Sequence, residues 1–193
     1  QRWTSQVGQD RTIVDIFGGK RGGYFIDLAS NDAVALSNTL TLEQEYGWNG
    51  LCIEPNPRYL QGLLRRKCKL AVAVATAMTG EKVSFAMRDE FGGIVGNDFD
   101  NKQVRGSVMN FTSVSITKLF QDFQVPEVVD YLSLDIEGAE YHTFKDFPWH
   151  KYKFLTMTVE RPKKLAPILK ANGYIYVKMH GGFGDMLYVH KSL

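Results

Sequence analysis

Apolar runs of strand length alternate with longer amphipathic segments, and this alternation constrains the fold more than any other feature of the chain. The pattern is typical of a parallel sheet whose strands are joined by covering helices. The predicted strands are residues 24–28, 51–54, 70–75, 129–134, 154–159, 174–179 and 186–190. The predicted helices are residues 37–46, 57–67, 115–123 and 162–172. The sequence therefore predicts a doubly wound α/β fold, with residues 1–193 forming one domain.

The last two predicted strands differ from the others because only a Gly-rich turn, residues 181–185, separates them. Short turns join antiparallel strands, whereas helical crossovers join parallel ones. We therefore expect a mostly parallel seven-stranded sheet with one antiparallel strand near its end. Residues 82–87 are predicted to form an extra antiparallel strand, and residues 88–111 a long loop. The aromatic residues that bracket this loop would either cover an acceptor or anchor the loop: Phe91, Phe99 and Phe111.

Composition and charge argue against several classes of function. The formal net charge is +2, and no dense Lys/Arg stripe with interleaved aromatics occurs, so nucleic acid is not an expected partner. The densest basic run, residues 65–69, is interpreted as the solvated end of a helix. No apolar stretch is long enough to span a bilayer. A cytoplasmic location is favoured, although the chain begins at Gln1 and a removed signal or anchor would leave no trace.

The chain has two cysteines, Cys52 and Cys68. They do not have the spacing of a metal site, and two thiols do not make a disulfide framework. Cys52 falls within an apolar strand, so we expect it to be an inert core thiol.

Small and polar residues follow the first two predicted strands, where an open parallel sheet binds its ligands. Asp27 is followed by Ala29 and Ser30, which allow a ligand to approach the backbone closely. Glu54 ends the second strand just before Pro55, and a carboxylate at that place can accept both hydroxyls of a ribose. The glycines of a pyrophosphate-binding turn are missing, which argues against NAD and FAD.

Several ordered motifs resemble the FkbM family of methyltransferases. They are Ser-Gln-Val-Gly-Gln-Asp at residues 5–10, Gly-Tyr-Phe-Ile-Asp at 23–27, Ser-Asn-Thr-Leu at 37–40, Gly-Trp-Asn-Gly-Leu-Cys-Ile-Glu-Pro-Asn-Pro at 47–57, and Asp-Tyr-Leu-Ser-Leu-Asp-Ile-Glu-Gly-Ala-Glu at 130–140. The resemblance implies a sheet of the class I methyltransferase (Rossmann-like) type and S-adenosylmethionine as cofactor. It also implies oxygen methylation, often of sugars or polyketide-type hydroxyls.

The resemblance implies roles for particular residues. Asp27, Ala29 and Asn31 would border the methionine part of the cofactor, and Glu54 would hold its ribose. Ala73 and Val74 would flank the adenine. The full implied cofactor-binding set is Gln6, Asp27, Ala29, Ser30, Asn31, Ser37, Asn38, Glu54, Pro55, Asn56, Ala73, Val74 and Asp135. The chain departs from the family at two positions where glycine is usual, Ala29 and Ala33.

Candidate catalytic residues lie at the ends of the later predicted strands. Asp135, Glu160 and His180 follow the fourth, fifth and sixth strands and share the edge of the sheet with the cofactor residues. Asp135 would orient the cofactor amine or face its sulfonium, and His180 has a suitable pKa for a general base. Asp135 and Glu160 are also hard oxygen ligands of the kind Mg²⁺ prefers, but we predict no metal site.

The main prediction is a methyltransferase that acts on a hydroxyl of a small molecule or sugar. Two alternatives stay open. Asp135-Ile136-Glu137 imitates the Asp-x-Asp signature of a metal-dependent nucleotide-sugar transferase. The alanines at 29 and 33 would also suit a catalytically silent binding module with the same fold. Nothing in the sequence indicates the oligomeric state.

Overall fold

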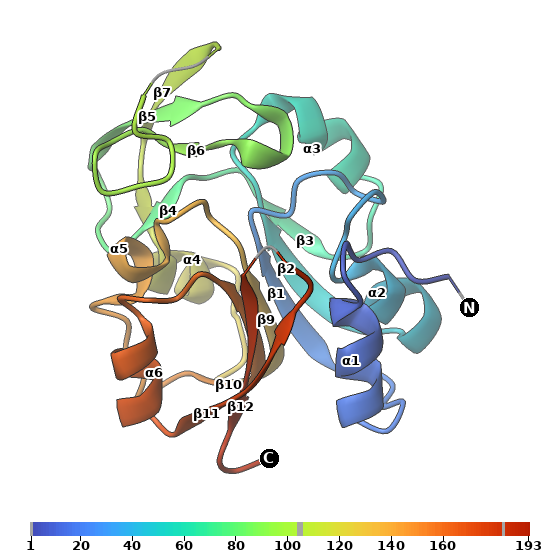
Figure 1. Cartoon of the computed structure of the whole chain (residues 1–193). Helices are drawn as coiled ribbons and strands as arrows, with labels where there is room; N and C mark the ends of the chain where they lie inside the picture. The colour runs from blue at the N-terminus through green and yellow to red at the C-terminus, as the bar shows by residue number, and fades with distance from the viewer. Residues whose placement is uncertain (1, 104–105, 183) are drawn as a thin grey trace.

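The computed structural model describes residues 2–103, 106–182 and 184–193. A seven-stranded sheet in the order β11-β12-β10-β9-β1-β2-β3 forms its centre (Figure 1). Its strands are β1 (Tyr24–Leu28), β2 (Asn49–Ile53), β3 (Lys69–Ala71), β9 (Val128–Leu134), β10 (Lys153–Glu160), β11 (Tyr174–His180) and β12 (Asp185–His190). Strand β12 runs in the direction opposite to the other six strands of this sheet. The predicted α/β fold with a mainly parallel sheet is confirmed.

Helices cover both faces of this sheet (Figure 1). One layer contains α1 (Gln9–Ile16), α2 (Leu40–Tyr46) and α3 (Pro57–Leu63), and the other contains α4 (Ile116–Asp122), α5 (Glu140–Phe144) and α6 (Ala166–Ala171). Side chains alternate along a strand, so one strand supplies both layers. Phe25 packs with the first layer, whereas Ile26 packs with the second. This alternation buries both faces of the sheet and leaves the strand ends as the place for polar residues.

Two helix starts follow directly from local sequence. Ser115 is the N-cap of α4, and its hydroxyl accepts a hydrogen bond from the Lys118 N–H at 3.2 Å. Asn56 caps α3 in the same way through the Arg58 N–H at 3.0 Å, and Pro57 occupies the first helical turn. The second β-strand is therefore joined to α3 by a turn whose shape is fixed by its own side chains.

The prediction of a loop over residues 88–111 is wrong in part. The structure has a short 3-10 helix, η1 (Asp89–Phe91), and an antiparallel sheet of β5 (Lys82–Ala86), β6 (Gly93–Ile94) and β7 (Val108–Thr112). We call this three-stranded unit the small sheet. It lies beyond the upper ends of the central strands in Figure 1. Strand β7 carries few buried residues, so its sequence lacks the apolar alternation that marks a strand. Residues 104–105 of this segment lie outside the described residues.

The chain leaves the central sheet earlier than predicted. The strand predicted at 70–75 ends at Ala71, and β4 (Ala75–Thr76) pairs instead with β8 (Val114–Ser115). Helix α1 was not predicted; its N-cap is Gly8, at a φ of 85°, without a side-chain cap. Strands β11 and β12 pair in antiparallel orientation, as expected. Phe183, in the turn between them, lies outside the described residues.

The interpretation of residues 65–69 as a solvated helix end is wrong for two of them. The side chain of Arg66 is only 3% exposed and forms an ion pair with Glu43 of α2, with 3.3 Å between Nη2 and Oε2. Cys68 is buried as well. Helix α3 ends at Leu63, so these residues fold back over the sheet rather than continuing the helix. Within the described ranges, the helices are too short or too polar to cross a membrane.

Candidate active site

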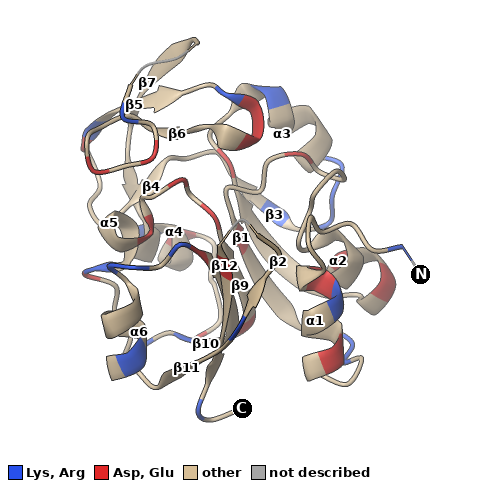
Figure 2. Cartoon of the chain, in the orientation of Figure 1, with Lys and Arg blue, Asp and Glu red and all other residues tan. Residues whose placement is uncertain are grey.

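A polar cavity of about 350 Å³ opens where β1, β9 and β10 end. Its wall is rich in carboxylates, and Figure 2 shows acidic segments around the ends of the central strands. The predicted site residues that line it are Gln6, Asp27, Ala29, Ser30, Asn31, Asn38, Asp135 and Glu160. Residues that the sequence places more than a hundred positions apart therefore converge on one cavity, because parallel strands end at the same edge of the sheet.

A smaller apolar pocket of about 30 Å³ lies next to this cavity, and Ala29 lines both. The predicted adenine-flanking residues, Ala73 and Val74, line it together with Pro55. Strand β6 of the small sheet supplies part of the opposite wall through Ile94. The two spaces together form a site with one apolar end and one acidic end.

The turn after β1 adopts an unusual backbone conformation. Ala29 and Asn31 have positive φ angles of 62° and 51°. An L-residue in the left-handed region is strained, which explains why glycine suits position 29 better than alanine. Ala33, the second departure from the family, is buried among core residues and lines neither space. A methyl group on Gly62 would lie 3.2 Å from the Ala33 Cβ, so the missing side chain at 62 makes room for Ala33.

Glu54 is 2% exposed, and both of its carboxylate oxygens are already hydrogen bonded. Oε2 accepts from the Asn31 N–H at 2.9 Å, and Oε1 accepts from the Asn56 N–H at 2.8 Å. Burial raises the pKa of Glu54 to about 7, and these two hydrogen bonds act in the opposite direction. Glu54 thus ties the turn after β1 to the turn after β2. It lines neither space, so its ribose role stays a prediction, as does a role for Asn56.

Ser37 and Asn38 precede α2 and occupy different positions. Ser37 is buried, and its hydroxyl accepts a hydrogen bond from the Leu40 N–H at 3.1 Å, which supports the start of the helix. Asn38 lines the cavity and donates from Nδ2 to the Ser133 hydroxyl at 3.0 Å. Its Oδ1 is buried and has no partner among the described residues, so it can accept a hydrogen bond from a ligand.

The N-terminal segment closes the cavity on the side of β12. Gln9 of α1 donates from Nε2 to Asp185 Oδ2 at 3.0 Å, and both side chains line the cavity with Gln6. His180 pairs with Asp185 in the strand register but is absent from the cavity wall. Burial, together with the charge of Lys178, lowers the pKa of His180. The structure thus places His180 beside the site rather than in its lining, and a catalytic role stays a prediction.

Four carboxyl groups crowd together at the other end of the cavity: Asp135, Glu137, Glu160 and Asp185. We call this group the acidic corner. Burial and then the Glu160 charge raise the pKa of Asp135 well above its usual range. Burial, followed by the same neighbour, raises the pKa of Glu137 to about 7 and that of Asp185 to about 6. Asp135 and Glu160 are close enough to share a proton, and Asp135 Oδ1 and Glu160 Oε2 are buried with no other hydrogen-bond partner in the described part of the chain. A cation or a proton would stabilise this arrangement.

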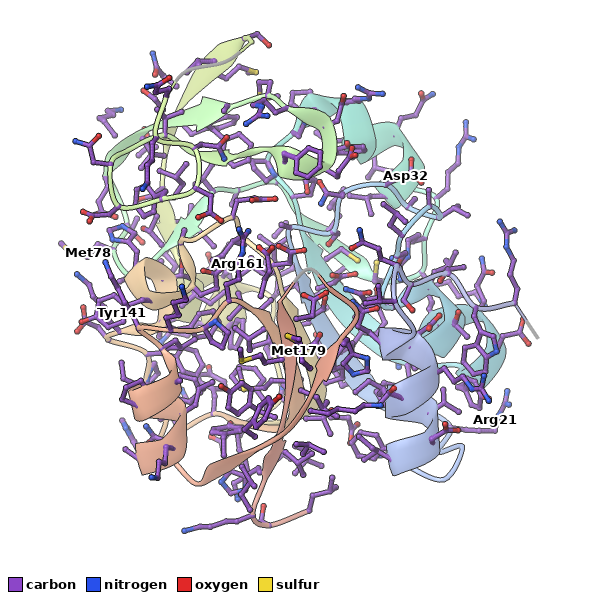
Figure 3. The ribbon with its side chains drawn as sticks, viewed as in Figure 1. Arg21, Asp32, Met78, Tyr141, Arg161 and Met179 are labelled. Atoms are coloured by element: carbon purple, nitrogen blue, oxygen red, sulfur yellow. The ribbon has the colours of Figure 1, made fainter. Side chains whose placement is uncertain are left out.

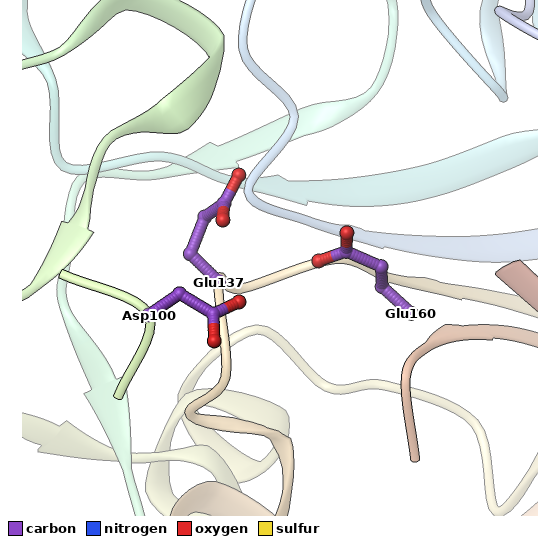
Figure 4. A group of neighbouring side chains, drawn as sticks. All are labelled: Asp100, Glu137 and Glu160. Carbon is purple, nitrogen blue, oxygen red and sulfur yellow. The ribbon is translucent and has the colours of Figure 1, made fainter. Parts of the chain in front are cut away.

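Arg161, labelled in Figure 3, partly neutralises this corner. Its Nη2 lies 2.6 Å from Glu160 Oε1, 3.3 Å from Glu137 Oε2 and 2.6 Å from Asp100 Oδ2. These three carboxylates, drawn in Figure 4, offer oxygen atoms within 4.8 Å of one another. A metal ion could be bound by such a group, but the Arg161 guanidinium already contacts all three. The preference for a site without metal stays a prediction.

Several residues of the cavity wall were not predicted as site residues. They are Gln9, Asp32, Ala35, Leu36, Arg58, Tyr59, Asp89, Glu90, Ser133 and Asp185. Gln9 stands in the first of the quoted motifs and so carried a signal. The wall also contains Phe91 and Glu137, both of which the sequence had already marked. Phe91 is 55% exposed at the wall, whereas Phe111 packs on Phe85 with ring centroids 5.9 Å apart. Phe91 of η1 thus lines the cavity, whereas Phe111 of β7 anchors the small sheet.

The family model of the methyltransferase FkbM domain matches residues 27–176, which include the ends of β1, β2, β9 and β10. The chain belongs to the FkbM methyltransferase family. This family assignment implies the use of S-adenosylmethionine and a small-molecule acceptor. Among curated proteins, no sequence matches the chain.

Two solved structures are similar to this chain, both at low sequence identity. A precorrin-6y C5,15-methyltransferase from Geobacter metallireducens GS-15 has 10% identity and a TM-score of 0.48, with 93% of this chain and 85% of that chain covered. A methyltransferase from Pyrococcus furiosus has 12% identity and a TM-score of 0.41, with coverage of 93% and 80%. Identities this low transfer no residue role to the FkbM domain.

Proposed function

We propose that this FkbM methyltransferase of the class I type methylates a hydroxyl group on a neutral small molecule or sugar. The observation that carries the proposal is the pairing of an apolar pocket with a carboxylate-lined cavity at the strand ends. S-adenosylmethionine has matching parts, an aromatic base at one end and a sulfonium and an ammonium at the other. Bound there, it would supply an electrophilic methyl group.

The residues present fit this cofactor at the acidic end. Asn38 Oδ1 and Asp135 Oδ1 are buried acceptors without partners in the described chain, and both residues line the cavity. Buried acceptors of this kind are costly unless a ligand satisfies them. In the proposal they receive the cationic groups of the cofactor, and Asp27 is a further carboxylate on that wall. Burial and then the Glu160 charge raise the pKa of Asp135, and a bound cation would lower it.

The apolar end fits less readily. The pocket lined by Ala73 and Val74 has a volume close to that of one water molecule, which is smaller than adenine. Since Gly93 and Ile94 of the small sheet form its opposite wall, the proposal requires the small sheet to move outward when the base enters. Glu54 would reach the ribose only if the turn at Asn31 moved as well.

Glu160 is the proposed base for the acceptor hydroxyl. Its Oε1 is held by Arg161, while Oε2 is buried and free of partners among the described residues. A hydroxyl placed against Oε2 would give up its proton to this carboxylate as the oxygen takes the methyl group. The negative wall disfavours carboxylate and phosphate acceptors by charge repulsion. A neutral hydroxyl compound therefore suits the cavity better than an anionic one.

Calorimetry with S-adenosylmethionine and S-adenosylhomocysteine tests the cofactor site. We expect one-to-one binding of both, weakened by Asp135→Ala but not by Glu140→Gln, a buried carboxyl outside the polar cavity. No binding of either compound would contradict the cofactor site. Metal-dependent binding of a nucleotide sugar in its place would favour the glycosyl-transfer alternative.

Transfer of a labelled methyl group to a panel of hydroxyl compounds, amines and carboxylates tests the acceptor class. Labelling of hydroxyl compounds, unchanged by EDTA and lost in Glu160→Gln, is the expected result. Labelling of amines or carboxylates alone would overturn the proposed acceptor. Cofactor binding without transfer to any acceptor would favour the silent binding module.

A further inference from the structure

The sulfur atoms of Cys52 and Cys68 lie 2.7 Å apart. A covalent S–S bond is about 2.05 Å long, so a shift of about 0.7 Å brings the two atoms to bonding distance. These are the only two cysteines of the chain, which leaves one intramolecular pairing. We propose that Cys52 and Cys68 form a disulfide that fastens the β2–α3–β3 unit of the cofactor side.

Independent backbone contacts hold the two cysteines in place. Cys52 lies within β2, between Asp27 of β1 and Leu70 of β3 in the strand register. The Cys68 N–H donates a hydrogen bond to Glu43 Oε2 at 3.0 Å, and the preceding Lys67 N–H donates to Oε1 at 3.0 Å. Because neither position depends on the sulfur contact, the fold itself brings the two thiols together.

The surroundings of the pair favour an intramolecular bond over other fates of a thiol. Cys52 is fully buried and Cys68 is 8% exposed, within the core cluster that includes Phe25 and Leu63. An external reagent can therefore reach Cys68 more easily than Cys52. Burial, and then the contact with Cys68, raises the pKa of Cys52 well above its usual range, so this thiol reacts slowly in the folded protein.

The bond would form by thiol–disulfide exchange, in which a low-molecular-weight disulfide oxidises the two cysteines. The Cys68 thiolate attacks one sulfur of the reagent and releases one thiol. Cys52 then loses its proton and attacks Cys68 Sγ, which breaks the mixed disulfide and releases the second thiol. The two protein thiols are oxidised, and one external disulfide is reduced to two thiols. Oxidation during folding avoids the slow step at buried Cys52.

The bond would close residues 52–68 into a loop that contains Glu54 and the whole of α3. Closing a loop of this size restricts the unfolded chain and stabilises the fold. It would also fix the turn after β2 from both ends. Structural disulfides persist in oxidising compartments and are rare in reducing ones, so the bond would indicate an oxidising environment.

Refolding of the reduced protein in a glutathione redox buffer tests the bond. After denaturation and treatment with N-ethylmaleimide, we expect an intact mass without adducts, and two adducts after prior reduction with dithiothreitol. Two adducts without reduction, or glutathione bound to Cys68 alone, would overturn the proposal. This measurement needs no substitution.

Thermal unfolding provides a second readout. Reduction of the oxidised protein should lower its Tm by about 5–10 °C. The matched control is the double variant Cys52→Ala/Cys68→Ala, whose Tm should not respond to dithiothreitol. A disulfide-bonded protein that melts at the same or a lower temperature than the reduced protein would show that the bond does not belong to this fold.

Discussion

Glu54 and Asp135 are buried acids at the same edge of the sheet, but their surroundings differ. Each follows a central strand, and burial raises the pKa of each. Glu54 receives two backbone N–H groups, from Asn31 and Asn56. Asp135 faces other carboxylates, and its Oδ1 lacks a partner in the described part of the chain. The first acid is satisfied by the fold, whereas the second is left for a ligand. Burial alone therefore does not distinguish a structural acid from a functional one.

The largest expected effect comes from removing the structural acid. Glu54→Ala leaves two backbone N–H groups unpaired in a buried turn, and each costs about 1–3 kcal/mol. We expect the free energy of unfolding, measured with urea at pH 6, to fall by about 3 kcal/mol. Asp135→Ala is the comparison, because it removes an acid that the fold leaves unpaired. If both variants lose the same free energy of unfolding, Glu54 is no more important for the fold than Asp135.

The pH dependence of stability provides a second test of Glu54. The pKa of Glu54 in the folded protein, about 7, lies above its ordinary value of 4.5. The folded state therefore holds this proton more tightly, and the associated stability is complete below pH 4.5 and lost as the pH rises through 7. We expect the free energy of unfolding to decrease from pH 5 to pH 7, with about 2 kcal/mol due to Glu54.

Glu54→Gln supplies the control for this titration, because the amide does not ionise but keeps one oxygen acceptor. Its free energy of unfolding should vary less steeply between pH 5 and pH 7 than that of the original chain. An unchanged slope would assign the titration to the other acids whose pKa values are raised, which are Asp27, Asp135, Glu137, Glu140 and Asp185.

The third prediction concerns the unsatisfied acid and the charge of the ligand. S-adenosylmethionine carries a sulfonium, whereas S-adenosylhomocysteine has a neutral sulfur. Because Asp135 must ionise to pair with the sulfonium, affinity for the methylated form should rise with pH relative to the demethylated form. We expect the ratio of the two Kd values to move in favour of S-adenosylmethionine as the pH rises, because the pKa of Asp135 is raised by burial and by Glu160.

Asp135→Asn should flatten this ratio, because the variant has no proton to release at that position. Glu140→Gln is the matched control, since Glu140 is buried near the same strand end but accepts hydrogen bonds from the Ile136 and Gly138 N–H groups. Loss of the pH dependence in both variants would mean that the acid next to the ligand is not Asp135.

Much of the central sheet and of its polar edge could be predicted because both depend on local sequence. Apolar runs end at Asp27, Glu54 and Asp135, and parallel strands bring such ends together. The resemblance to the FkbM family added the cofactor and the residues before α2. The resemblance could not show that Glu54 is hydrogen bonded within the fold while Asp135 is not. This difference depends on which backbone N–H groups of the turns point at each carboxylate.

The parts that escaped prediction depend on contacts between distant segments. Gln9 meets Asp185 across 176 positions, and no local pattern indicates that these two side chains contact each other. Strand β7 gains its place by pairing with β5, although its side chains are mostly exposed. The closeness of Cys52 and Cys68 is likewise a result of the fold, since the chain turns back after α3 to begin β3.

The smallest expected effect separates the two alanines that stand where the family usually has glycine. Ala29 has a positive φ, so glycine would relieve strain of about 1 kcal/mol, and the greater freedom of glycine in the unfolded chain offsets part of this gain. Ala29→Gly should therefore stabilise the fold by about 0.5 kcal/mol in urea unfolding. Ala33→Gly should instead destabilise it by about 1 kcal/mol, because the lost methyl group packs in the core. If both variants lose stability equally, Ala29 is not strained, and the turn that separates the apolar and acidic ends of the site is built for alanine.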